Sequence, residues 1–283
     1  LTANDPLLLT PGPLTTSAET KEAMLHDWGS RDQDFIDTNT RVCERLLAIA
    51  NASESHVCVP LQGSGTFIVE AALCTLIPPN GKALILVNGA YGKRMAKILD
   101  YASRSYLIQE TPEDQPPSIG NLEEALDTDA DISHVLAVHC ETTSGILNPI
   151  ENISNVVKSR GRSLFIDAMS AFGAINLDAE HVYFDALVAS SNKCLEGVPG
   201  VGFALIRSEV LKVCERNSHS LSLDLFDQWR TMESNAQWRF TPPTHVIVAL
   251  DKAIEQFESE GGVAGRFARY SENCRMLTDG MRE

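Results

Sequence analysis

From about residue 55 the chain alternates short apolar runs with helix-length amphipathic segments. This alternation predicts an α/β fold, in which βαβ units build a mostly parallel sheet flanked by helices. Connections between parallel strands are right-handed and leave the loops at the carboxyl ends of the strands free to form a site. The apolar runs predict strands at 57–60, 83–87, 105–108, 134–139, 163–166, 186–189 and 201–206, and the segments between them predict helices at 66–76, 91–101, 122–126 and 150–159.

The two ends of the chain differ from this central pattern. Thr10-Pro11-Gly12-Pro13 cannot continue as a helix, and an amphipathic segment at 34–50 leads into the sheet. After residue 207 we expect a short helix, a polar stretch to residue 240 and a helix at 245–258. A last helix from about residue 263 is still in register at Arg282-Glu283. We therefore divide the chain into an N-terminal arm and helix, a large α/β domain, and connecting helices that begin an incomplete C-terminal small domain, at residues 1–54, 55–245 and 246–283.

The composition is that of an ordinary soluble globular protein, with 43% hydrophobic residues and a mean hydropathy of −0.08. Its 38 acidic and 23 basic residues give a formal net charge of −15, which argues against nucleic acid or an anionic membrane as a partner. No apolar run approaches the roughly 20 residues of a membrane helix, and the amino end lacks the layout of a secretory signal. The seven cysteines show no CxxC spacing, so we expect reduced thiols in a cytoplasmic protein, without disulfides or a metal site.

A single lysine follows the predicted strand at 186–189, in the segment Ser190-Ser191-Asn192-Lys193-Cys194-Leu195. A lysine at the end of a buried strand can act as a nucleophile rather than as a solvated charge. Asp167 stands at the end of the predicted strand at 163–166. Together the two suggest pyridoxal phosphate, because a lysine forms a Schiff base with its aldehyde while a carboxylate keeps its pyridine nitrogen protonated. Alone, Asp167 is also typical of a helix N-cap, and Lys193 of a surface lysine.

A glycine-rich turn, Gln62-Gly63-Ser64-Gly65-Thr66, lies between a predicted strand and a predicted helix. Its backbone N–H groups, the hydroxyls of Ser64 and Thr66 and the helix dipole converge on a spot that fits an anion. We interpret the turn as a phosphate cradle, although the same pattern also occurs where a chain only turns tightly. The lysine of a nucleotide P-loop is absent, and so is a dinucleotide-binding GxGxxG.

Two more turns follow strands of the predicted sheet. Asn88-Gly89-Ala90-Tyr91-Gly92 presents Tyr91, which either stacks on a cofactor ring or caps the following helix. His139-Cys140-Glu141-Thr142-Thr143-Ser144-Gly145 presents Glu141 and Thr142. These two either reach the phenolic oxygen of the cofactor, position the substrate or form a self-satisfied polar turn.

These motifs occur in the order that is found in the class V aminotransferases of pyridoxal phosphate fold type I, and the chain resembles that family over essentially its whole length. The resemblance rests on Leu9-Thr10-Pro11-Gly12-Pro13, Gly63-Ser64-Gly65-Thr66, Asn88-Gly89-Ala90-Tyr91-Gly92, Glu141-Thr142-Thr143-Ser144-Gly145, Asp167-Ala168-Met169-Ser170 and Ser190-Ser191-Asn192-Lys193. It implies the large domain of that fold.

The resemblance also implies roles for individual residues. Lys193 would carry the internal aldimine and then shuttle a proton, and Asp167 would pair with the pyridinium nitrogen. Thr241, in Arg239-Phe240-Thr241-Pro242-Pro243, matches a threonine that reaches the phosphate of the neighbouring subunit, which implies a homodimer. The remaining cofactor contacts implied in this way are Ser64, Gly65 and Thr66 at the phosphate, with Tyr91, Thr142 and Asn192.

Within the family the chain is most similar to the branch that transfers the amino group of 2-aminoethylphosphonate to pyruvate, a step of phosphonate catabolism. The pointers are the segments 7–15, 26–32, 167–173 and 192–200. This similarity implies phosphonoacetaldehyde and L-alanine as products, and we expect Gly12 at the substrate. Arg31 either contacts the phosphonate, which needs a positive partner, or is an exposed arginine beside a helix. An alanine– or serine–glyoxylate aminotransferase, a cysteine desulfurase and a catalytically idle cofactor-binding protein are the alternatives. Family members usually have a C-terminal arginine that clamps the substrate carboxylate, and no residue of this sequence matches it.

Overall fold

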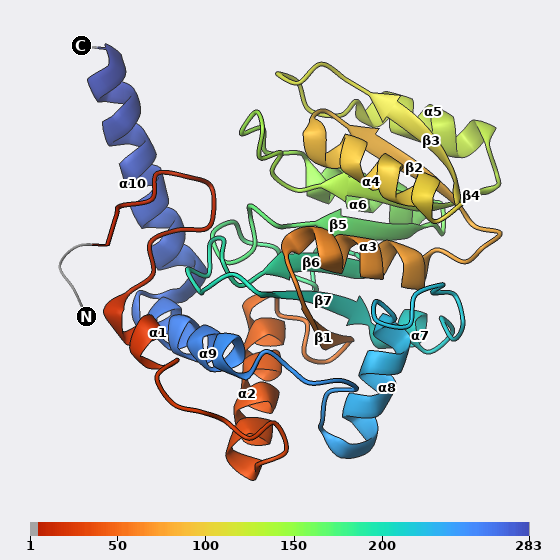
Figure 1. Ribbon diagram of the computed structural model, residues 1–283. Coiled ribbons are helices and arrows are strands. Elements are labelled where there is room, and N and C mark those ends of the chain that lie inside the picture. Colours follow the sequence, from red (N-terminus) through yellow and green to blue (C-terminus); the bar gives the residue numbers. More distant parts are fainter. Residues whose placement is uncertain (1–4, 283) are drawn as a thin grey trace.

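A seven-stranded sheet forms the centre of the computed structural model, which describes residues 5–282 (Figure 1). The strands lie in the order β1-β7-β6-β5-β4-β2-β3. Only β7 runs antiparallel to its neighbours, so the predicted α/β fold with a mostly parallel sheet is confirmed. Each predicted strand overlaps one of the observed strands, which are β1 His56–Gln62, β2 Lys82–Val87, β3 Ser105–Glu110, β4 Ile132–Val138, β5 Ser163–Asp167, β6 Ala186–Ser190 and β7 Val201–Arg207.

Alternating side chains of the strands build one apolar core on each face of the sheet. In β2, for example, Leu84 and Leu86 belong to one core, while Ala83, Ile85 and Val87 belong to the other. Such alternation follows from the two-residue period of a strand, and burial on both faces explains why the inner strands are almost wholly apolar, whereas the edge strand β3 is largely exposed and more polar. The helices that cover the two faces include the four predicted ones, now α3 Gly65–Leu76, α4 Ala90–Tyr101, α5 Ile119–Thr128 and α6 Ile150–Ser159.

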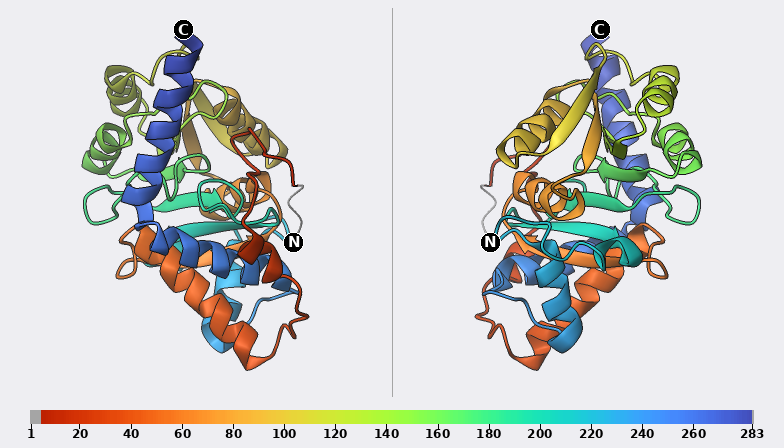
Figure 2. Two further views of the ribbon diagram at one scale, coloured as in Figure 1. Left: turned by 90° about the vertical axis from the view of Figure 1, so that its left-hand side faces the viewer. Right: turned by 90° about the vertical axis from the view of Figure 1, so that its right-hand side faces the viewer.

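The helices near the two ends of the chain meet below the sheet in Figure 1. There α2 (Gln33–Ile49) packs against α9 (Thr244–Ser259), and the short α1 (Ala18–Glu22) also contacts α9. From α9 the chain continues into α10 (Gly262–Arg282), which extends away from the sheet. Figure 2 shows the N-terminal segment and α10 on the same side of the molecule.

The prediction for residues 208–240 is only partly confirmed. The short helix exists as α7 (Ser208–Leu211), but the expected polar stretch contains a further helix, α8 (Leu225–Asn235). Asp224 caps the N-terminus of this helix, because its side chain accepts a hydrogen bond from the backbone N–H of Asp227. Its fully buried residues lie in the first turn, and Trp229 packs partly buried against the same core. Leu225, Trp229 and Met232 recur at helical spacing, and this is the signal that the sequence analysis missed. Within residues 5–282, no helix has both the length and the apolar character needed to cross a bilayer.

Candidate active site

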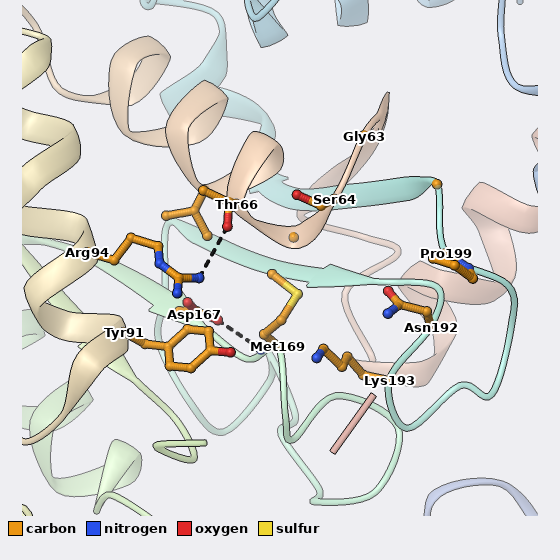
Figure 3. Close-up of a pocket in the computed structure, with 13 residues that line it drawn as sticks. Gly63, Ser64, Thr66, Tyr91, Arg94, Asp167, Met169, Asn192, Lys193 and Pro199 are labelled. Atoms are coloured by element: carbon orange, nitrogen blue, oxygen red, sulfur yellow. Dashed lines mark hydrogen bonds between the residues drawn. The ribbon is translucent and has the colours of Figure 1, made fainter. Parts of the chain in front are cut away.

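A cavity of about 430 Å³ opens at the carboxyl edge of the sheet (Figure 3). Parallel strands end at the same edge, so the turns after β1, β2, β5 and β6 all reach this cavity. The structure thereby brings together predicted site residues from four separate parts of the chain. Those that line the cavity are Ser64, Gly65, Thr66, Tyr91, Asp167, Asn192 and Lys193.

Lys193 enters the cavity from the turn that follows β6. Its Nζ donates a hydrogen bond to the backbone carbonyl of Gly12, 3.2 Å away. Gly12 has a φ of +147°, and a Cβ at this position would overlap Cδ of Lys193. The N-terminal arm therefore touches the lysine through a backbone position that only glycine fits. Gly12 was expected at the substrate, and the structure places it at the lysine amine.

Asp167 is the last residue of β5 and is 2% exposed. One of its carboxylate oxygens accepts a hydrogen bond from the backbone N–H of Met169 at 2.9 Å. Burial raises the pKa of Asp167 to about 6, the hydrogen bond from Met169 lowers it, and the negative charge of Glu141 adds to the increase. A cation in front of this carboxylate would restore its charged form, so the position suits a protonated ring nitrogen.

The phosphate cradle forms at the N-terminus of α3. Ser64 precedes the helix, and the first N–H groups of a helix lack partners within it, which makes them donors for an anion. Glycine at position 65 lets the helix start lie against Met169, because a Cβ here would approach Sδ of Met169 to 2.7 Å and displace that side chain. The hydroxyl of Thr66 accepts a hydrogen bond at 3.2 Å from the guanidinium of Arg94.

Arg94 is a site residue that the sequence analysis missed. It lies on α4, lines the cavity and adds a positive charge beside the cradle (Figure 3). Its guanidinium carbon is 4.6 Å from the centre of the Tyr91 ring. Residues three apart on a helix share a face, so the spacing from Tyr91 was the signal that could have identified Arg94.

Glu141 lies next to the part of the cavity wall that Tyr91 and Arg94 form, and its side chain is fully buried. Its carboxylate accepts hydrogen bonds from the backbone N–H of Tyr91 at 3.3 Å and from the hydroxyl of Thr143 at 2.8 Å. Glycine at position 89 leaves space for the side chain of Glu141, because a Cβ at this position would overlap its carboxylate. Glu141 thus holds the start of α4, which carries Tyr91 and Arg94, and it does not line the main cavity.

Three predicted site residues lie elsewhere in the structure. Thr142 faces a neighbouring cavity of about 530 Å³, where its hydroxyl is 2.6 Å from that of Ser170. Thr241 is exposed and lines a third hollow of about 490 Å³, which shares Gly63 with the main cavity. Arg31 is exposed in the turn before α2 and lines neither the main cavity nor the one that contains Thr142.

The donor set fits pyridoxal phosphate. A phosphate-sized cradle with an arginine lies at one end, an amine faces the cavity at the other, and a buried carboxylate lies between them with an aromatic ring alongside. Glycine at position 65 keeps the helix start close to Met169, so the backbone donors stay at the cavity wall.

Comparison with known proteins gives consistent results. The family model of aminotransferase class-V matches residues 30–283. The 2-aminoethylphosphonate–pyruvate transaminase of Pseudomonas fluorescens is 56% identical over 276 residues, which cover 98% of this chain and 75% of the relative. The enzyme of the same name from Pseudomonas aeruginosa is 55% identical over 272 residues, covering 96% of this chain and 73% of the relative.

Solved structures share the fold. The pyridoxamine–pyruvate aminotransferase of Mesorhizobium loti superimposes with a TM-score of 0.84 at 26% identity, covering 94% of this chain and 68% of that one. The alanine–glyoxylate aminotransferase of Nostoc sp. gives a TM-score of 0.89 at 23% identity, covering 98% and 74%, and supports the fold alone. The chain therefore belongs to the aminotransferase class-V family, and its cofactor is pyridoxal phosphate.

Proposed function

We propose that the protein transfers the amino group of 2-aminoethylphosphonate to pyruvate, giving phosphonoacetaldehyde and L-alanine. The observation that carries the proposal is the convergence of Lys193 and Asp167 on one cavity, in a chain 56% identical to a transaminase named for these substrates. The similarity to an alanine–glyoxylate aminotransferase extends only to the fold.

We assign the residues of the cavity as follows. Ser64, Gly65 and Thr66 hold the cofactor phosphate with backbone and hydroxyl donors, and Arg94 neutralises its charge. Tyr91 lies against the ring, and Asn192 borders the site next to the lysine. When bound, pyridoxal phosphate supplies an electron sink for the carbon that bears the amine.

The chemistry left to the protein is covalent attachment and proton transfer. Nζ of Lys193 would hold the cofactor covalently and, when free, would take a proton from the amine-bearing carbon of the substrate and deliver it to the cofactor. The carboxylate of Asp167 keeps the ring nitrogen protonated, because it is a buried negative charge with only one backbone donor beside it. The carbonyl of Gly12 orients the lysine amine while it waits for substrate.

We further propose that the protein is a cytoplasmic homodimer. Thr241 is exposed outside the main cavity, as expected of a residue that completes the phosphate site of a partner. The large apolar side chains of Phe67 and Phe240 flank it and are each 52% exposed, so this face offers apolar surface to a second copy. All seven cysteines are free, which suits a reducing compartment. Light scattering on a sizing column measures the dimer directly.

A substrate comparison tests the reaction. The holoenzyme should form alanine from 2-aminoethylphosphonate and pyruvate at least about tenfold faster than it transfers the amine of serine or alanine to glyoxylate, a difference of about 1.4 kcal/mol in barrier. The product aldehyde is trapped and quantified separately, so that alanine from a contaminant is not counted. Equal or faster turnover with glyoxylate would contradict the proposal and indicate a glyoxylate aminotransferase instead.

A further inference from the structure

Arg266 is the one residue of α10 whose side chain is buried, with 2% exposure. Its Nη1 donates a hydrogen bond to the backbone carbonyl of Cys194, the residue next to Lys193. Its Nε donates to the carboxylate of Glu260 at 2.7 Å. The guanidinium also lies over the ring of Phe257, 5.3 Å from its centre. The helix α10, which otherwise extends into solvent, thus places the charge of Arg266 against the backbone of the turn that carries Lys193.

Stability alone does not explain an arginine at this place. Burying a guanidinium costs several kcal/mol of solvation, and buried ion pairs are often no more stable than apolar side chains of the same size. The pocket around Arg266 already contains apolar surface from Phe257 and Tyr270. A methionine would fill such a pocket without the solvation cost. The arginine adds ion pairs with Glu260 and Glu196 and a directed hydrogen bond to the carbonyl of Cys194, so its polar contacts tie α10 to the turn after Lys193.

The turn at residues 193–197, here called the lysine turn, is held by α10 at a second point. Glu196 has a left-handed backbone with a φ of +59°, and its N–H donates to the carbonyl of Lys193 at 2.8 Å. Its carboxylate accepts hydrogen bonds from Arg269 at 2.9 Å and from the hydroxyl of Tyr270 at 2.7 Å. A non-glycine residue in this conformation costs about 1–3 kcal/mol and persists where its surroundings fix it.

We propose that Arg266 is a positioning residue of the reaction: it anchors the backbone of the lysine turn to α10 and so fixes where Nζ of Lys193 stands in the cavity. The inference rests on the proposed function, in which Lys193 is the reacting amine. A displacement of a reacting group by about 1 Å lowers turnover by up to about a hundredfold. The partners of Arg266, which are Cys194, Glu196 and Glu260, do not line the main cavity. Loosening the turn should therefore lower kcat and leave KM nearly unchanged.

The test compares Arg266→Met and Arg266→Lys with Arg275→Met in the holoenzyme. Arg275 lies on the same helix and, among residues 5–282, pairs with its helix neighbours Glu272 and Asp279, away from the lysine turn. Arg266→Met should lower kcat about tenfold or more with KM within about threefold, and Arg266→Lys should recover part of kcat because an ammonium still donates to the carbonyl. Arg275→Met should leave both constants unchanged.

A measurement without the cofactor separates positioning from folding. In cofactor-free protein, the labelling rate of Lys193 by a small amine-reactive reagent, read by peptide mass spectrometry, should change at least about threefold in Arg266→Met, because Nζ loses its fixed place beside Gly12. Tyr270→Phe, which removes one bond to Glu196 and keeps the ring, should change it in the same direction by less.

Two outcomes overturn the inference. One is a kcat of Arg266→Met within about twofold of wild type. The other is a loss of activity equal to the loss of folded protein, with unchanged labelling of Lys193 in the folded fraction. Lys193→Ala is measured alongside: if it stays active, the proposed site is wrong, whereas an inactive Lys193→Ala with normal Arg266 variants refutes the positioning role alone.

Discussion

The amine of Lys193 and the carbonyl of Gly12 form a hydrogen bond of 3.2 Å across 181 residues of sequence. This bond joins the N-terminal arm to the turn after β6, and it defines one end of the cavity in which Asp167 stands at the end of the neighbouring strand β5. The arm therefore belongs to the site. Its Pro-Gly-Pro segment is rigid at the prolines and lets the chain pass close to the lysine only at the glycine.

Gly12→Ala should impair the site through this contact. A Cβ would overlap Cδ of Lys193, and alanine at a φ of +147° adds backbone strain of about 1–3 kcal/mol. We expect kcat to fall about tenfold or more, and the thermal midpoint to change little because the arm is mostly exposed. Gly120→Ala, at a helical position with open space around it, is the control. Wild-type kcat in Gly12→Ala would show that the arm does not constrain the lysine.

Lys193→Ala should abolish the covalent attachment of the cofactor and lower turnover by several orders of magnitude, about 4 kcal/mol or more in barrier. The variant can still bind pyridoxal phosphate through the cradle, because Ser64, Gly65 and Thr66 are unaffected. Borohydride reduction followed by peptide mapping identifies the attached lysine in the wild type, with Lys158→Ala as a surface control. A pyridoxyl group on any other lysine would contradict the assignment.

The sequence identifies Lys193, Asp167 and the glycine-rich cradle because each directly follows a strand, and the ends of parallel strands share one edge. The contacts that hold the lysine turn cannot be predicted from the positions of the strands. The bond from Arg266 to Cys194 spans 72 residues and depends on how α10 leaves α9, so no local pattern marks Arg266 as buried. Arg94 is missed for a different reason, because an arginine within an amphipathic helix is usually exposed to solvent. Only its spacing of three residues from Tyr91 indicates that it lies on the helix face that borders the cavity.

Arg94→Gln should weaken binding of pyridoxal phosphate about 10- to 100-fold, since a hydrogen bond to a charged group contributes about 1.5–3 kcal/mol. Arg94→Lys should restore part of the affinity through its charge. The neighbouring Lys93→Gln is a matched control, because Lys93 pairs with Glu110 and does not line the cavity. Cofactor titration of the cofactor-free protein gives the affinities. Equal affinities in Arg94→Gln and wild type would place the phosphate away from Arg94.

Asp167→Asn should have opposite effects on catalysis and on the stability of the cofactor-free protein. Without the charge the ring nitrogen is less readily protonated, so turnover should fall by several orders of magnitude, about 4 kcal/mol or more in barrier. In the cofactor-free protein, burial disfavours the charged form of Asp167 more than the charges of Arg94 and Lys193 favour it, and asparagine removes that cost.

The pH dependence of stability isolates this cost. The pKa of Asp167 is raised from 3.8 to about 6 by burial, so between these values the folded protein binds more protons than the unfolded chain. Its contribution to stability is therefore present below pH 3.8 and is lost as the pH rises to about 6, by roughly 3 kcal/mol. Denaturant unfolding gives the free energy of unfolding of cofactor-free wild type and Asp167→Asn at each pH in this range. The difference between the two cancels the contributions of the other titrating groups. Relative to the wild type, the variant should become more stable as the pH rises. Adding pyridoxal phosphate should reverse the trend, because the ring cation favours the charged carboxylate; a difference that stays constant with pH would show that Asp167 keeps its ordinary pKa.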